Sequence, residues 1–392
     1  MFFILALFAF FAIALPDAML GVAWPFMRVT FDQPIAAVTL LLPFGVAASL
    51  LSTSCWTWAA AHLGLGRLLT ASVAMSAAAL ICCAVAPSFG VIVGCAVLFG
   101  LSGGAIDAAL NAYAAHHFGP RQIGLMHAAY GLGAATSPLV VTAVVSLGAS
   151  WRWAYCSVAL IQGCLTLLFL TSAHRWNKST SAIRATTKAT TVISPRPTWW
   201  RTRPTFKAAL GLALAAVGSG LEAVLGLWAF TFLLDAVDMT AKLAGLVVSG
   251  YWIALVVSRV LLGSLAERIG IWPFLAGTTV TAIGAAALLL TNGPTTTSVA
   301  IIVLGFAVAP LSPLLMLTTG ERTAVASVDR LVGFQAAATT LGSVLLAGFV
   351  GLLMGHDLSA FTYCVLALAL LTSIGVWTVR PGHPNSPGNS AD

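Results

Sequence analysis

Long apolar runs recur along the whole sequence, and they constrain the fold more than any other feature. Of the 392 residues, 59% are hydrophobic and 7% are charged, whereas an average globular chain carries about 25% charged residues. A helix of about 20 apolar residues, rising 1.5 Å per residue, crosses the roughly 30 Å hydrocarbon core of a bilayer. The sequence therefore predicts an all-α polytopic membrane protein.

Twelve apolar spans are predicted, and most connections between them are short. One longer segment, rich in Ser, Thr, Pro and Arg, divides the spans six and six. The expected domains are an N-terminal six-helix bundle at 1–173, a basic linker at 174–206, a C-terminal six-helix bundle at 207–379 and a tail at 380–392. The spans cover about residues 2–24, 36–58, 68–86, 89–113, 124–147, 153–173, 207–234, 243–264, 272–290, 299–319, 330–353 and 358–379.

The distribution of Lys and Arg predicts how the spans are oriented. With the even-numbered connections and the tail on one side, that side holds fourteen basic residues and the other side holds three. Cytoplasmic loops carry such an excess, so we expect both termini and the linker in the cytoplasm, as in a multi-pass protein of the inner or plasma membrane. The net charge of +7 lies mainly in the linker, and it indicates topology rather than nucleic-acid binding.

A short segment is repeated in the two halves of the chain. DAMLG at 17–21 reappears as EAVLG at 222–226, at an offset of 222 − 17 = 205. Gly100 and Gly305 keep the same offset, 305 − 100 = 205. Two landmarks thus agree on a six-helix duplication. Transporters are often built from such repeats, with the substrate site where the halves meet.

Three acids lie well inside the spans, and none has a basic residue within a helical turn: Asp17, Asp107 and Glu222. A charge at the centre of a membrane helix costs about 2.5–3.5 kcal/mol, so it normally faces a cavity and is functional. Desolvation without a partner favours the neutral acid, which suits a group that binds a proton on one side and releases it on the other. We interpret the three as proton-coupling and substrate residues. For Asp17 and Glu222 the alternative is helix-packing polarity inherited from the duplication.

Further polar residues gather in spans four and five. Asn111 follows Asp107 by four residues and shares its helical face. His127 and Tyr130 share a face of the returning span, and Gln335 lies in a looser echo of this region in the second half. We predict that Asn111, His127, Tyr130 and Gln335 line the substrate cavity. The alternative for His127 is a hydrogen bond between helices.

Two other groups of residues are candidates for function. Trp24 and Trp228 follow the repeated acids and are included among the cavity residues, although Trp also anchors spans at membrane interfaces. Arg259, Glu267 and Arg268 lie toward the cytoplasmic end of span eight, where they are expected to form ion pairs that close the cytoplasmic gate. The alternative for the gate residues is an ordinary charged loop.

Two loop motifs resemble those of the major facilitator superfamily. They are GASWRW at 148–153 and GSLAERIG at 263–270, the latter close to the signature G-x-L-A-[DE]-R-x-G. The resemblance covers nearly the whole chain and implies two pseudo-symmetric six-helix bundles. Asp107 with Asn111 resembles the acid-x3-Asn element in span four of the fucose/proton symporter branch, and Asp17 and Glu222 fall on that branch's acids in spans one and seven.

The residues and the resemblance together predict proton-coupled symport of a small polar, sugar-like solute by alternating access. The alternative is proton-coupled efflux of a drug or an amphipathic metabolite, whose span-five signature is partly met at Pro138. An enzyme is not expected, because the sequence has no HExxH motif and no paired GxGD-like aspartates. We expect no cofactor, no metal and no nucleic acid. The expected partners are a small-molecule substrate, protons and the bilayer, and the expected state is a monomer.

Overall fold

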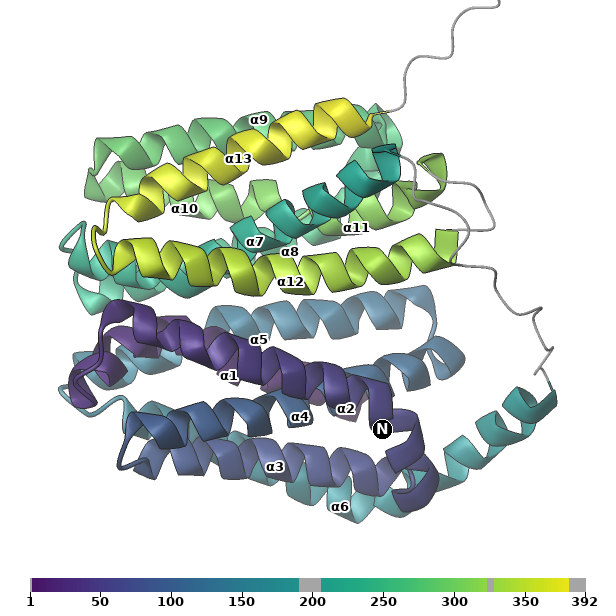
Figure 1. Cartoon of the computed structure of the whole chain (residues 1–392). Helices are drawn as coiled ribbons and strands as arrows, with labels where there is room; N and C mark the ends of the chain where they lie inside the picture. The colour runs from purple at the N-terminus through teal and green to yellow at the C-terminus, as the bar shows by residue number, and fades with distance from the viewer. Residues whose placement is uncertain (1, 190–205, 323–327, 381–392) are drawn as a thin grey trace, which may run out of the picture.

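The computed structural model describes residues 2–189, 206–322 and 328–380. In this part of the chain, twelve helical segments are long and apolar enough to cross a membrane. They form two groups of six that lie against each other (Figure 1). The central part of the predicted linker and nearly all of the predicted tail lie outside the described residues.

The N-terminal half contains the first six spans. Its second span begins as a 3-10 helix, η1, and continues without interruption as α2. The elements are α1 (Phe2–Thr30), η1 (Ile35–Leu40), α2 (Leu41–Leu63), α3 (Leu65–Val85), α4 (Phe89–His117), α5 (Pro120–Ser146) and α6 (Arg152–Ala189).

The C-terminal half contains the other six, and its fourth span is broken. Pro310 lies at the break and Pro313 lies in the first turn of α11, where proline is tolerated because the N–H that it lacks would have no partner within the helix. The elements are α7 (Phe206–Asp235), α8 (Ala241–Ile269), α9 (Ile271–Leu288), η2 (Leu289–Thr291), α10 (Pro294–Val308), α11 (Leu311–Leu317), η3 (Thr318–Glu321), α12 (Val328–Met354) and α13 (Ala360–Val379).

Helix α6 is longer than predicted. The expected span ends at residue 173, but the helix runs to Ala189, so the beginning of the predicted linker is helical. Phe169 and Trp176 are seven residues apart and fully buried, and the Trp176 ring packs against Phe2 and Tyr113. The buried face therefore continues beyond the point where the apolar run ends, which is why the hydrophobicity of the sequence placed the boundary too early.

The two halves repeat the same packing. In the N-terminal half α1 packs on α5, α2 on α4 and α3 on α6; in the C-terminal half α7 packs on α12, α8 on α10 and α9 on α13. Adding 205 to the bounds of α1 gives 207–235, against Phe206–Asp235 for α7. Adding 208 to the bounds of α5 gives 328–354, the bounds of α12. The predicted duplication into two pseudo-symmetric bundles is confirmed.

Glycines of the repeated segment let the halves meet. The halves touch mainly through α5 with α8 and α1 with α7. A Cβ added to Gly21 of α1 would lie 2.7 Å from the carbonyl oxygen of Gly226 in α7, closer than real Cβ atoms approach. Gly21 and Gly226, the last residues of DAMLG and EAVLG, therefore mark the point where α1 and α7 cross. Asp17 and Glu222 precede these glycines by four residues, or about one helical turn, and so lie close to the crossing.

One end of the molecule carries the start of α1, the end of α6 and the start of α7, and we call it the linker side (right in Figure 1). At the opposite side the halves are joined by an ion pair between α1 and α7, from Arg28 Nη2 to Asp235 Oδ2, at 3.0 Å. Nearby, the rings of Phe26 and Phe230 lie 6.1 Å apart, and η1 packs on α12. These contacts hold the opposite side closed.

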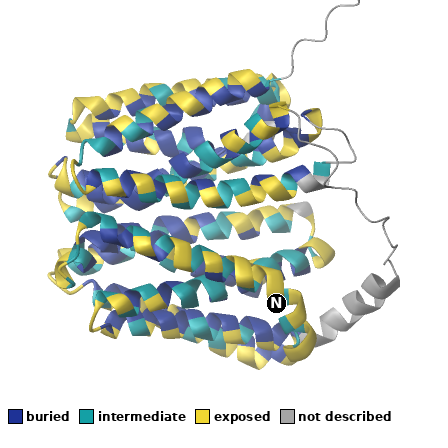
Figure 2. Ribbon diagram, in the orientation of Figure 1, coloured by how far each residue is buried: buried dark blue, intermediate teal, exposed yellow. Residues whose placement is uncertain are grey.

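The outer surface is apolar, as a lipid-facing surface must be. Buried residues cluster between the helices, and exposed ones follow their outward faces (Figure 2). Large exposed hydrophobic residues occur along most helices, with examples at Phe8, Leu51, Leu160, Val260 and Leu345. A soluble monomer rarely exposes so much contiguous apolar surface, so this surface fits a bilayer.

Candidate functional site

Two adjoining cavities lie between the halves. Their volumes are about 620 Å³ and 600 Å³, within the range of small-molecule sites. The first is lined mainly by the C-terminal half and the second by the N-terminal half. They share the lining residues Asp17, Leu20, Leu42, Val46 and Arg259, so we treat them as one central cavity.

Asp17 is exposed to this cavity and is held by a neutral partner. The Tyr130 hydroxyl of α5 donates a hydrogen bond to Asp17 Oδ2 at 2.9 Å. The contact forms because small residues, Ala14, Ala18 and Ala134, pack together and bring α1 close to α5. The two predicted site residues thus meet.

Asp107 lies on the same wall and also has a neutral donor. Asn111 Nδ2 donates to Asp107 Oδ1 at 2.9 Å along one face of α4. His127 of α5 lines the cavity beside Asp107 and interacts with it electrostatically, and its ring packs edge-on against Phe10 at 5.4 Å. Asn111 is not among the cavity-lining residues; it supports Asp107 instead.

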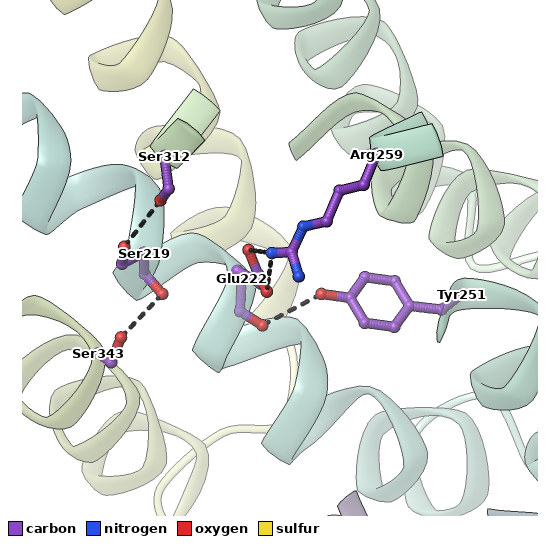
Figure 3. A network of polar contacts seen from close by, with 6 residues as sticks. All are labelled: Ser219, Glu222, Tyr251, Arg259, Ser312 and Ser343. Carbon is purple, nitrogen blue, oxygen red and sulfur yellow. Dashed lines mark hydrogen bonds and ion pairs between the residues drawn. The ribbon is translucent and has the colours of Figure 1, made fainter. Parts of the chain in front are cut away.

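Glu222 differs from the other two acids because it has a charged partner. Arg259 Nη2 lies 3.0 Å from Glu222 Oε1 and 3.2 Å from Oε2, and the Tyr251 hydroxyl donates to the Glu222 backbone oxygen at 3.2 Å (Figure 3). The expectation that all three acids lack a compensating cation is therefore wrong for Glu222. Arg259 lines the cavity and pairs with Glu222 in this structure, and its role in a gate with Glu267 and Arg268 stays a prediction.

The position of Arg259 inside an apolar span already indicates that it needs an acidic partner. A cation inside a membrane span is as costly as an acid, and such charges pair with one another. No basic residue lies within one helical turn of Glu222, and its partner Arg259 is 37 positions further along the chain, in α8. Only the tertiary fold brings them together.

Serines and threonines extend the polar wall of the C-terminal half. Ser219 Oγ lies 3.2 Å from Ser312 Oγ, and Ser343 Oγ donates to the Ser219 carbonyl at 3.2 Å (Figure 3). Thr339 and Thr340 line the same wall. Sequence reasoning missed all five because single hydroxyls are common in apolar helices. The repeat offset could have found one, since 107 + 205 = 312 pairs Asp107 with Ser312.

Gln335 lines the cavity as predicted, although little of it is exposed. Its Oε1 accepts a hydrogen bond from Thr319 at 3.1 Å, and Arg322 Nη2 donates to the same threonine hydroxyl at 3.2 Å. With the offset of 208 found for α5 and α12, 127 + 208 = 335, so Gln335 is the repeat counterpart of His127.

Trp24 and Trp228 are not cavity residues, and their inclusion was wrong. Both are fully buried, and each indole N–H donates to a backbone carbonyl at 2.8 Å, Ile35 for Trp24 and Ala347 for Trp228. They fasten α1 to η1 and α7 to α12. Trp252 does line the cavity, and among the described residues its buried indole nitrogen has no hydrogen-bond partner.

Glu267 and Arg268 lie exposed at the linker-side end of α8. In this structure, whose halves are in contact at the opposite side, neither residue forms an ion pair within the described part of the chain. Their role in a gate stays a prediction. Glu321 accepts a hydrogen bond from the Trp272 indole at 2.9 Å, and the side chains of Asp329 and Arg330 lie outside the described residues.

Comparison with known proteins places this geometry in a family. No curated protein gave a significant match to the chain. Among solved structures, the nucleoside transporter NupG has a TM-score of 0.74 at 14% identity, covering 96% of this chain and 97% of that one. A D-xylose-proton symporter has a TM-score of 0.73 at 14% identity, covering 97% of each chain.

A third similar structure is the peptide transporter POT in complex with sulfate, with a TM-score of 0.73 at 11% identity, covering 96% of this chain and 93% of that one. At these identities the likeness shows the fold alone. The sequence profile of the Major Facilitator Superfamily matches residues 6–236, which is more than half of the 392 residues. The chain therefore belongs to the major facilitator superfamily, and it is a multi-pass membrane transporter rather than an enzyme.

Proposed function

We propose that this transporter carries a small polar, sugar-like solute together with protons, by alternating access, as in the fucose/proton symporter branch that it resembles. The observation that carries the proposal is the environment of two acids. Asp17 and Asp107 face the cavity between the halves, and each accepts a hydrogen bond from a neutral donor, Tyr130 or Asn111. A carboxylate that is not locked in an ion pair can be neutralised by a proton without stranding a cation.

The driving force is sufficient for uphill transport of a neutral solute. One proton moving down 100 mV supplies about 2.3 kcal/mol, and about 1.4 kcal/mol corresponds to a tenfold concentration ratio. One proton per cycle therefore supports roughly fifty-fold accumulation.

The arrangement in the cell is part of the same proposal. The linker side is cytoplasmic, since it carries the excess of Lys and Arg. The transporter works as a monomer with the predicted domain boundaries, adjusted by the longer α6. Glu267 and Arg268 contribute to closure of the linker side.

Exchange of Asp107 for Asn tests the proposal. Proteoliposomes that contain Asp107→Asn should lose proton-driven accumulation while solute exchange across the bilayer persists, because the amide fills the same space but cannot carry a proton. Asp32→Asn is the matched control: Asp32 is an exposed loop acid whose left-handed backbone, φ 51°, asparagine also adopts. Undiminished uphill uptake by Asp107→Asn would remove Asp107 from coupling.

Efflux of an amphipathic compound remains the second candidate, and the wall of the N-terminal half favours it. Apolar side chains line the cavity there, including Phe10, Ile13, Ile92 and Phe99. Import predicts that adding substrate makes the medium around energised cells more alkaline. Efflux predicts instead that expression of the protein confers resistance.

A further inference from the structure

The Arg259 guanidinium is not fully used by its ion pair. A single nitrogen, Nη2, contacts both oxygens of Glu222, so the usual fork, in which two nitrogens face two oxygens, is not formed. Among the described residues, no hydrogen bond engages Nε or Nη1 of Arg259. A planar edge of N–H donors is thus left for another acceptor.

This edge is placed where a solute would bind. Arg259 lines both parts of the central cavity, and 42% of its side chain is exposed. Hydroxyl and amide groups surround the same space on the C-terminal wall, notably Ser312, Thr339 and Gln335. A guanidinium edge recognises a planar carboxylate through two parallel hydrogen bonds, and the hydroxyls can bind the polar remainder of the same molecule.

The charges around Arg259 link anion binding to protons. With Asp17 and Asp107 ionised, the cavity holds three carboxylates against one guanidinium, and an anion is repelled. With both neutral, Glu222 and Arg259 cancel, and an anion is accepted. The titratable and charged groups that line or neighbour this space, besides Arg259, are Asp17 from α1, Cys83 from α3, Asp107 from α4, His127 and Tyr130 from α5, Tyr155 from α6, Glu222 from α7 and Tyr251 from α8.

We infer that the solute is a small hydroxylated carboxylate, such as a sugar acid, whose carboxylate binds the free edge of Arg259. The inference rests on the proposed transport function, because it assigns a substrate class to the same cavity. It departs from the neutral sugar that the resemblance implies. Glu222 then acts as an internal competitor that holds Arg259 in position until the solute arrives.

Binding to purified full-length protein tests this without any proton gradient. The probes are D-glucuronate, D-gluconate and L-lactate, each against its neutral amide, measured by calorimetry at acidic pH. At least one carboxylate should bind about 10- to 100-fold more tightly than its amide, the range expected for hydrogen bonds to a charged group. Arg259→Gln should remove this preference, and Glu222→Gln, which deletes the competitor, should strengthen carboxylate binding.

A double variant protects the test against misfolding. Arg259→Gln combined with Glu222→Gln removes both charges of the ion pair together, so neither partner is left unpaired, and it too should bind each acid and its amide alike. Equal binding of acids and amides by the unmodified protein would overturn the inference. So would tighter binding of the cation tetraphenylphosphonium than of any carboxylate, together with a gain of cation binding in Arg259→Gln.

The two proposals fail in different ways. If a carboxylate binds as expected but a proton gradient does not drive its uptake into proteoliposomes, the proton-coupled function fails and the substrate class stands. If a proton gradient drives uptake of a neutral sugar and no carboxylate is preferred, the substrate class fails and the coupled function stands.

Discussion

The two halves of the molecule place an acid at the same position of the repeat and give it opposite partners. Asp17 in α1 accepts a hydrogen bond from the Tyr130 phenol at 2.9 Å, whereas Glu222 in α7 pairs with the Arg259 guanidinium at 3.0 Å. The helices that carry the acids have matching bounds after a shift of 205 residues. The scaffold is duplicated, but the electrostatics of the two acids are not.

The difference suggests a division of labour. A carboxylate held by a neutral phenol becomes neutral on protonation and leaves no charge behind. A carboxylate paired with arginine leaves an uncompensated cation when it is protonated, which is costly away from bulk water. We therefore propose that proton coupling belongs to the N-terminal half, through Asp17 and Asp107, and that solute recognition belongs to the C-terminal half, through Arg259 and the hydroxyls around it.

The largest expected effect comes from the partner of Asp17. Tyr130→Phe keeps the ring and removes the hydroxyl, and hydrogen bonds to charged groups contribute about 1.5–3 kcal/mol. The initial rate of proton-driven uptake in proteoliposomes should fall about 10- to 100-fold. The control is Tyr363→Phe, an exposed tyrosine on α13. A normal uptake rate in Tyr130→Phe would show that the hydrogen bond from the phenol is not the reason why Asp17 and Glu222 differ in function.

The next effect concerns the crossing that brings the two acids near each other. Gly21→Ala adds a Cβ that would lie 2.7 Å from the Gly226 carbonyl, and overpacking of this kind costs about 1–3 kcal/mol. We expect about a tenfold loss of transport rate with normal insertion into the membrane. Gly94→Ala on α4 is the matched control, because nothing lies within 4 Å of its added Cβ; equal behaviour of the two variants would contradict the role of the crossing.

A smaller effect is expected in the stability of the C-terminal pair. Arg259→Gln leaves Glu222 without its cation, but both side chains are partly exposed, at 42% and 23%, so solvent screens the loss. We expect a cost of about 1 kcal/mol, seen as a decrease of a few degrees in the melting temperature of purified protein. A much larger decrease in the melting temperature would mean that the pair mainly stabilises the packing of α7 on α8 and is not a recognition group.

The smallest effect should come from the ion pair at the opposite side. Arg28→Gln removes the contact with Asp235, and such a pair contributes about 0–1 kcal/mol. We expect up to a fivefold shift toward the state that is open at the opposite side, measured by labelling of an engineered cysteine near the cavity. Exchange of the two charges, Arg28→Asp with Asp235→Arg, should restore the original labelling rate.

Much of the fold could be predicted because it is dictated locally. Twelve apolar runs and a repeat offset of 205 were enough to predict the number of spans and the two bundles. The end of α6 was misplaced because Trp176 continues a buried face after the apolar run ends. Hydrophobicity detects lipid contact better than it detects burial against protein.

The site could be predicted in part. The acids and Tyr130 could be identified because polar groups are rare in apolar spans. Their partners could not, since Arg259 reaches Glu222 from another helix, and the serine network joins α7, α11 and α12. Trp24 and Trp228 follow the acids in sequence, yet each points into the core and donates to a carbonyl. Which way a side chain points depends on tertiary packing.

Proton-driven accumulation by Asp17→Asn and Glu222→Gln, measured side by side in proteoliposomes under an imposed proton gradient, tests the division of labour most directly. Our account predicts that Asp17→Asn equilibrates solute without concentrating it, whereas Glu222→Gln still concentrates solute with an altered affinity. The account is contradicted if Glu222→Gln loses accumulation and Asp17→Asn retains it.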